Sequence, residues 1–333
     1  MVASKRLNSK KEGLGRITES RTDPTWGCSP SRIKNSKWFE AHKYTAGQLS
    51  LGHKTDQQYY FYDATGLVIK GHCSYKEISR ALAEEGLTPI RTTDGRAFVS
   101  IWFNIIRDSV CGEYHEIAIS IDATQYGENC GVDVASTDNP FHHLYSNFGS
   151  SVCKCQFMHS LYINSPVSIA WGREMQAFPK HIDPVDSMIE DSSRCFESKI
   201  QWQNDLIFRA SVRKQFGLAQ FVKQGLGLVS GIGPLRMLNF LTASQFEVPI
   251  QMPQKIARQY SLPSKYLSVI RKGLHPGSVQ CWPWGDSDML ELGDVVRQSG
   301  SEANNGHDLI RRSGFTPTVV TYLPFMQAYI GEP

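Results

Sequence analysis

Much of this chain alternates apolar and polar residues with a period of two. In "KIQWQNDLIFRASV" Ile200 and Trp202 are separated by a polar residue, and a polar turn follows at 203–205. The alternation then resumes from Leu206 to Val212. Since successive strand side chains point to opposite faces, the segment predicts a β-hairpin with one buried face. Further strands are predicted at "VSIWFNIIRD", "EYHEIAISI" and "HSLYINSP", and mixed strand and helix character at "TVVTYLPFMQAYI".

A period near 3.6 occurs in "SYKEISRALAEEG", which predicts a helix over 74–86. Ser74 and Glu77 have the spacing of a capping box, and Gly86 stands where a left-handed C-cap belongs. Three apolar residues fall at i, i+3 and i+4 between these signals: Ile78, Ala81 and Leu82.

A second helix is predicted in "SKYLSVIRKG", from Ser264 to Gly273. Basic residues near its end would interact favourably with the helix dipole. With several strands and few helices, the chain is expected to be an α+β protein, built mainly from antiparallel β-structure with a few outer helices. No internal repeat is present.

Residues 1–40 are rich in Ser, Lys, Arg, Asn and Gly, so a polar N-terminal extension is expected before a single domain at 41–333. Glu12 and Glu19 argue against an organelle address in this basic stretch, because transit peptides are poor in acids. No apolar run approaches the ~18–20 residues of a membrane span, and the N-terminus lacks the apolar segment of a secretory signal. A cytoplasmic protein is expected.

Composition is that of an ordinary globular protein, with 41% hydrophobic and 20% charged residues. The formal net charge of +3, without a basic cluster beyond the N-terminal extension, argues against a nucleic-acid binder. The eight cysteines have no repeated spacing, so a disulfide framework is not expected. Cys153 and Cys155 form a C-x-C, which we interpret as two thiols on one face of a strand.

Three other motifs favour structural explanations. The glycines of "KQGLGLVSGIGP" lack the spacing of a phosphate-binding loop, so a bulged surface loop is favoured. His142 and His143 are adjacent on an extended segment and face opposite ways, which argues against a metal site. The aromatic "VQCWPWGDSD" indicates packing. No metal or cofactor is predicted.

Lys180 is the one candidate reagent, and it ends the segment "AWGREMQAFPKH". Most lysines are surface charges, but this one directly follows Phe178 and Pro179, with Trp171 shortly before. Burial would lower its pKa, because desolvation disfavours the ammonium, and only the neutral amine attacks a carbonyl. Moving the pKa from ~10.4 to near 7 takes about 4–5 kcal/mol, which an apolar pocket can supply.

These residues resemble the central motif of the acetoacetate decarboxylase family. The match in "HSLYINSPVSIAWGREMQAFPKH" covers Gly172-Arg173-Glu174 and Phe178-Pro179-Lys180, and "GEYHE" is similar to the family's Tyr-x-Glu. The resemblance extends over about 45–330. It implies a curved antiparallel sheet or barrel with outer helices and a mostly apolar interior cavity, a homo-oligomer, and no cofactor.

The resemblance also implies the chemistry. Lys180 would form a Schiff base with the ketone of a β-keto acid, and Glu116 would orient the substrate or handle protons. The supporting residues would be Arg173, Glu174, His181, Tyr114, Phe178 and Trp102.

Two departures bear on the substrate. His181 stands where the decarboxylases usually carry a second lysine, so desolvation must carry most of the lowering of the Lys180 pKa. The segment "SIWFNII" lacks the carboxylate that the family carries before Tyr-x-Glu, and Lys70 is only a loose candidate for the family's N-terminal arginine. A larger, more apolar substrate than acetoacetate is therefore expected.

The leading hypothesis is a Schiff-base-forming lyase that decarboxylates a β-keto acid or polyketide-like carbonyl compound. Some relatives use the same lysine for aldol, retro-aldol or dehydration steps, and longer members occur beside polyketide pathways. The resemblance therefore indicates secondary metabolism as one setting. The alternative from another class is a non-catalytic binder of apolar ligands in the cavity.

Overall fold

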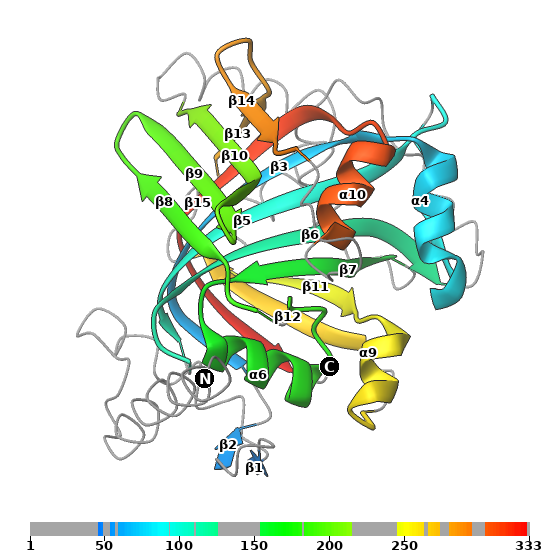
Figure 1. Cartoon of the computed structure of the whole chain (residues 1–333), viewed down its shortest axis with the longest axis vertical. Helices are drawn as coiled ribbons and strands as arrows, with labels where there is room; N and C mark the ends of the chain where they lie inside the picture. The colour runs from blue at the N-terminus through cyan, green and yellow to red at the C-terminus, as the bar shows by residue number, and fades with distance from the viewer. Residues whose placement is uncertain are drawn as a thin grey trace.

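The chain folds around one large curved sheet (Figure 1). The computed structural model describes residues 46–48, 54–56, 59–92, 94–109, 111–125, 154–181, 183–214, 245–262, 266–273, 280–294 and 304–331. The predicted polar extension, the glycine-rich motif and the histidine pair lie outside these ranges. No helix in the described ranges is long and apolar enough to cross a membrane.

The large sheet has nine strands, and neighbours along it run β12-β11-β7-β6-β5-β3-β15-β13, with β4 beside β6. Every described pairing in it is antiparallel except that of β11 with β7. β12 also pairs with β15, so the ladder leads from β15 through β12 and β11 to β7. The strands are β3 (Tyr59–Cys73), β4 (Leu87–Pro89), β5 (Ala97–Ser109), β6 (Tyr114–Gln125), β7 (Lys154–Ile163), β11 (Gln245–Gln251), β12 (Tyr266–Gly273), β13 (Gln280–Pro283) and β15 (Thr316–Gly331).

A four-stranded antiparallel sheet, in the order β14-β10-β9-β8, covers one face of the large sheet. Its strands are β8 (Asp186–Asp191), β9 (Cys195–Trp202), β10 (Asp205–Arg213) and β14 (Met289–Leu292). A separate two-stranded ladder joins β1 (Ala46–Gln48) to β2 (Lys54–Asp56).

Two apolar layers follow from the alternation along the long strands. On what we call the small-sheet face, Ile69, Phe103 and Ile117 pack with the four-stranded sheet and with helices α4 (Tyr75–Leu82) and α10 (Asn304–Arg312). On the α6 face, Val68 and Trp102 pack with α6 (Pro166–Gln176) and α9 (Gln254–Gln259). The predicted α+β class, mainly antiparallel with a curved sheet and a few helices, is confirmed.

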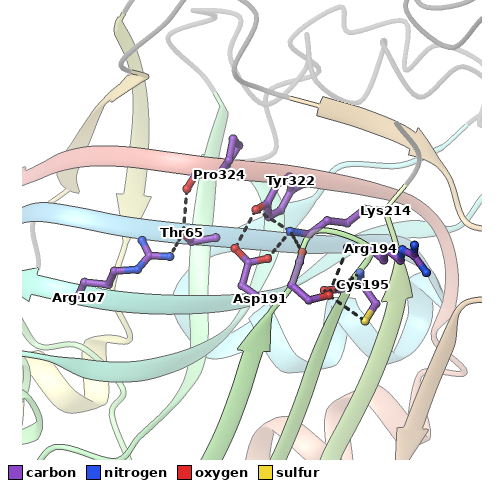
Figure 2. Close-up of polar contacts among 9 residues, drawn as sticks. Thr65, Arg107, Asp191, Arg194, Cys195, Lys214, Tyr322 and Pro324 are labelled. Carbon is purple, nitrogen blue, oxygen red and sulfur yellow. Dashed lines mark hydrogen bonds and ion pairs between the residues drawn. The ribbon is translucent and has the colours of Figure 1, made fainter. Parts of the chain in front are cut away.

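One buried ion pair fastens the two sheets together (Figure 2). The Nζ of Lys214, at the end of β10, contacts Asp191 and donates to Tyr322 OH on β15 at 2.8 Å. Tyr322 OH in turn donates to Asp191 Oδ2 at 2.9 Å, and burial raises the pKa of this phenol. Because all these partners are satisfied, the cluster is explained as a structural joint.

The helix predicted over 74–86 is confirmed as α4 followed by the short 3-10 turn η1 (Ala83–Glu85). Ser74 Oγ accepts from the backbone N–H of Glu77, Ile78 and Leu82 are buried, and Gly86 has φ 67°. The predicted hairpin is also confirmed as β9 and β10, with positive φ at Gln203 and Asn204. Such a two-residue turn matches the right-handed twist of the strands.

The helix predicted from Ser264 to Gly273 is wrong, because Tyr266–Gly273 form strand β12. This segment pairs with β11 on one side and β15 on the other, so sheet pairing prevails over its helical spacing. The closing segment is strand throughout in β15, and the helical part of its mixed character is not present.

Candidate active site

Helix α6 positions the candidate lysine. It begins with Ser165 as N-cap and Pro166 in the first turn, and Ser165 Oγ accepts from the N–H of Ser168 at 3.3 Å. It ends where Ala177 adopts a left-handed φ of 54°, and the N–H of Phe178 returns to Gly172 O at 2.9 Å. The chain therefore turns sharply just before Lys180.

The turn sends Lys180 alongside β7. Leu161 donates its N–H to Pro179 O at 3.0 Å and accepts from the N–H of His181 at 2.8 Å, which forms a parallel bridge to Lys180. These two bonds fix which face each side chain occupies. Lys180 points to the α6 face, and His181 points to the small-sheet face.

The Lys180 side chain is only 3% exposed. Its Nζ donates to the carbonyl oxygen and to the Oγ of Ser168, both at 2.9 Å. The rings of Phe178 and Tyr114 lie 5.6 and 5.8 Å from Nζ. The only described ion pair of this ammonium is with Glu116, whose Oε2 is 4.0 Å away.

Burial lowers the pKa of Lys180 below its ordinary value, and the negative charge of Glu116 opposes this in part. The direction follows from desolvation, because one carboxylate at 4.0 Å does not replace the hydration of an ammonium. A lysine in this state supplies the neutral amine that attacks carbonyl carbon more readily than a surface lysine does.

Glu116 lies on β6, in register with Asn104 on β5. The Nδ2 of Asn104 is 3.5 Å from Glu116 Oε1, while Oε2 faces Lys180, so the two carboxylate oxygens have different neighbours. Asn104 is a site residue that the sequence did not single out. Strand alternation places it on one face, but only the register, which the sequence does not encode locally, places it opposite Glu116.

Arg173 holds the main chain of the candidate lysine. Its Nη1 donates to Lys180 O at 2.5 Å, and its Nε donates to Tyr260 OH at 3.1 Å. Its guanidinium carbon lies 5.8 Å from the ring centre of Tyr260. The Arg173 side chain thus supports Lys180 from behind, in a fully buried position.

The other predicted residues occupy several elements of the fold. The His181 ring packs against Trp202 and Tyr162, with centroids 5.5 and 6.4 Å away, on the face opposite Lys180. Lys70 forms a buried ion pair with Asp122, away from Glu116 on the same sheet. Glu174 is half-buried on α6. Trp102 lies on the α6 face and donates from Nε1 to Ser120 Oγ at 3.0 Å.

A cavity of about 250 Å³ lies beside this segment but does not include Lys180. Its lining includes Pro179, His181, Arg173, His159 and Lys255. Since Pro179 and His181 face it, the cavity is on the opposite side of the chain from the ammonium. Its lining is mixed, since Phe157, Leu161 and Ile256 also contribute to it. The apolar cavity predicted around Lys180 stays a prediction.

Within the described ranges, no group of three or more His, Cys, Asp or Glu side chains is arranged to hold a metal ion. The described cysteines, at positions 73, 111, 155 and 195, are not joined in disulfides. The polar side-chain groups described at this site are the Lys180 amine, the Glu116 carboxylate, the Ser168 hydroxyl and the Asn104 amide.

Residues 49–190 match the sequence model of the family described as Acetoacetate decarboxylase (ADC). The resemblance to this family is confirmed. The matched segment carries both Lys180 and Glu116 and ends before the β9–β10 hairpin. No curated protein matches the chain.

Solved structures overlap the chain loosely. One is an acetoacetate decarboxylase from Legionella pneumophila subsp. pneumophila str. Philadelphia 1, with 12% identity, TM-score 0.48 and 87% of each chain covered. Another is an acetoacetate decarboxylase-like enzyme from Sphingomonas wittichii RW1, with 13% identity, TM-score 0.43, and coverage of 83% of this chain and 91% of that one. The enduracididine biosynthesis enzyme MppR has 10% identity and TM-score 0.44, with 82% and 87% covered.

Proposed function

We propose that this chain is a Schiff-base-forming lyase that decarboxylates a β-keto acid or polyketide-like carbonyl compound through Lys180. The observation that carries the proposal is the buried amine with one carboxylate at 4.0 Å. A lysine that merely stabilised the fold would be expected to have a close acid, as Lys214 has in Asp191 and Lys70 has in Asp122.

The proposed reaction begins with the neutral Lys180 amine, which attacks the ketone carbon, and loss of water gives an iminium. The bond between the α-carbon and the carboxylate then breaks, and its electron pair moves towards the iminium nitrogen as carbon dioxide leaves. Protonation of the resulting enamine carbon and hydrolysis of the imine release the ketone and restore the amine.

In this scheme Glu116 accepts the proton of the attacking amine or returns a proton to the enamine, since its Oε2 faces Nζ. Asn104 and Arg173 are positioning residues. Asn104 orients the carboxylate through its other oxygen, and Arg173 holds the carbonyl group of Lys180. Tyr114 and Phe178 supply the apolar walls that disfavour the ammonium.

The same iminium also permits aldol, retro-aldol or dehydration chemistry, which is the second candidate. It is favoured by the absence of a carboxylate from the β5 segment "SIWFNII", where Asn104 is the polar residue facing Glu116. A non-catalytic binder of apolar ligands is the third candidate. It requires a Lys180 that does not react with carbonyl compounds.

The test is to incubate the protein with β-keto acids or ketones and borohydride, which reduces an imine to a stable amine. We expect a mass increase that maps to Lys180 and is lost in Lys180→Ala. Lys255→Ala, an exposed lysine of α9, is the control and should leave the adduct in place. If wild type forms no adduct with any of these carbonyl compounds, or if Lys180→Ala keeps full activity, the proposal is wrong. Release of carbon dioxide then separates decarboxylation from aldol-type chemistry.

A further inference from the structure

Four buried polar side chains gather on the α6 face of the large sheet, at a distance from Lys180. They come from four neighbouring strands and are each no more than 5% exposed. Lys70 is in register with Ser100, and Asp122 is in register with Gln156. The Nζ of Lys70 reaches across β5 to pair with Asp122 Oδ2. We call this set the distal polar cluster: Lys70, Ser100, Asp122 and Gln156.

Three atoms of the cluster have no hydrogen-bond partner among the described residues. They are Asp122 Oδ1, Gln156 Nε2 and Ser100 Oγ. A buried polar atom left in this state costs about 1–3 kcal/mol, so sheets rarely carry three together without a reason. The set comprises an acceptor, a donor and a hydroxyl. A ligand group that both donates and accepts would satisfy it, and a neutral hydroxyl is the simplest such group.

A carboxylate does not suit this cluster, because the negative charge of Asp122 would repel it. An ammonium does not suit it either, since Lys70 already pairs with Asp122. The cluster thus differs in chemistry from the reacting end of a β-keto acid and is matched to an uncharged polar group.

The cluster and the candidate active site share one face of β6. Glu116 and Asp122 are six residues apart on this strand, and even-numbered positions between them point the same way. At about 3.3 Å per residue, the two positions are roughly 20 Å apart along the strand. Most of the face between them is apolar, with Val68, Trp102 and Ala118 in the same core layer. Ser120, which also lies between them on β6, accepts from Trp102 Nε1.

We propose that the distal polar cluster binds a hydroxyl group at the far end of an elongated substrate whose carbonyl reacts with Lys180. The substrate class is thereby a long, mostly apolar β-keto compound with a terminal hydroxyl. This inference rests on the proposed Schiff-base function for the role of the near end. Binding of the terminal hydroxyl to the distal polar cluster can be measured separately from the reaction at Lys180.

The test compares two linear 3-oxo acids of equal length, on the order of 20 Å, one ending in a hydroxyl and one in a methyl group. In wild type we expect the hydroxyl-ended compound to have a kcat/KM about five- to ten-fold higher, the value of one or two net hydrogen bonds. Ser100→Ala and Gln156→Met should each reduce this preference.

Ser198→Ala is the matched control, because Ser198 is a buried serine on β9 whose Oγ also has no partner among the described residues. It should leave the preference intact. Circular dichroism checks that each variant is folded. Equal kcat/KM for the two acids in wild type, or an unchanged preference in both folded variants, would mean that the cluster holds only ordered water and would overturn the inference.

Calorimetric titration of Lys180→Ala with the matching long-chain methyl ketones separates this inference from the proposed function. If wild type forms no borohydride adduct but Lys180→Ala still binds the hydroxyl-ended ketone more tightly, the proposed chemistry fails and the distal site stands. If adducts form but neither ketone is preferred, the chemistry stands and the distal site fails.

Discussion

Gly172 lies directly against the side chain of Lys180. A Cβ at position 172 would stand 2.3 Å from Cε and 2.7 Å from Nζ, closer than any real contact. The helix that carries Arg173 therefore also provides the space in which the lysine is buried. Gly172 and Lys180 are therefore coupled by packing in this chain.

Gly172→Ala should displace the lysine tip and leave most of the fold intact. Since the neighbouring atoms are the far end of a flexible side chain, we expect a stability cost of only about 1–3 kcal/mol. Imine formation should fall by about 100-fold, because a shift of 1 Å in a reacting group has an effect of this size. Borohydride trapping measures imine formation as the amount of adduct, and urea unfolding measures stability.

The control is Gly306→Ala on α10, where a Cβ would meet Ile119 Cδ1 at 2.6 Å and Tyr162 OH at 2.8 Å. It introduces a similar overlap on the small-sheet face. It should lower stability by a similar amount and leave trapping at the wild-type level. Equal loss of trapping in both variants would mean that the effect of Gly172→Ala is on folding alone.

Glu116→Gln should lower the pKa of Lys180 further. The Glu116 charge opposes the effect of burial on this amine, so its removal leaves desolvation less opposed. The rise of imine formation with pH should therefore move to lower pH. Decarboxylation should slow at the same time if Glu116 handles protons.

Stopped-flow trapping across a pH series measures that shift. Glu113→Gln is the control, because Glu113 is an exposed carboxylate just before β6 and should leave the pH dependence unchanged. A shift to higher pH in Glu116→Gln would contradict the geometry around the lysine.

The sequence predicts an element of this protein only where the pattern that specifies the element lies within the element itself. Helix α4 has its caps and apolar stripe within a dozen residues, so local physics was sufficient to predict it. Helix α6 is buried on nearly all sides, with Val167, Trp171 and Arg173 all covered, and so it has no apolar stripe to reveal it. The Ser165-Pro166 pair was its one available start signal.

Pairing between strands that are distant in the sequence determines the structure of β12 and the position of Asn104. The segment that forms β12 has helical spacing, and only the presence of β11 and β15 on either side makes it a strand. The meeting of Glu116 and Lys180 was expected from the family resemblance, not from spacing. Asn104 joined them through strand register, which depends on partners far along the chain.

His181→Lys should not restore a second active-site lysine. The ring of His181 packs on Tyr162 and Trp202, on the face opposite Lys180, so a lysine there would bury an ammonium among aromatic side chains. We expect a loss of stability of about 2 kcal/mol or more, and no change in the pH dependence of trapping. His181→Gln, which is neutral, serves as the control for loss of the ring. Faster trapping at neutral pH in His181→Lys would mean that the new ammonium acts on Lys180.

His159 should make the protein less stable in acid. Burial lowers the pKa of this imidazole to about 4, and the nearby positive charge of Arg312 acts in the same direction. Its folded pKa therefore lies below the ordinary 6.5, and between these values the unfolded chain binds more protons. The contribution to stability is complete above pH 6.5 and is lost as the pH falls from 6.5 to about 4. Allowing for partial exposure of the residue, we expect the loss of folding stability to be about 1–2 kcal/mol.

Urea unfolding of wild type and His159→Gln over this pH range measures the difference in stability between them, which should shrink as the pH falls. Arg312→Gln should raise the pKa of His159 and reduce the acid loss, and a pKa near 6.5 by NMR in wild type would refute the prediction.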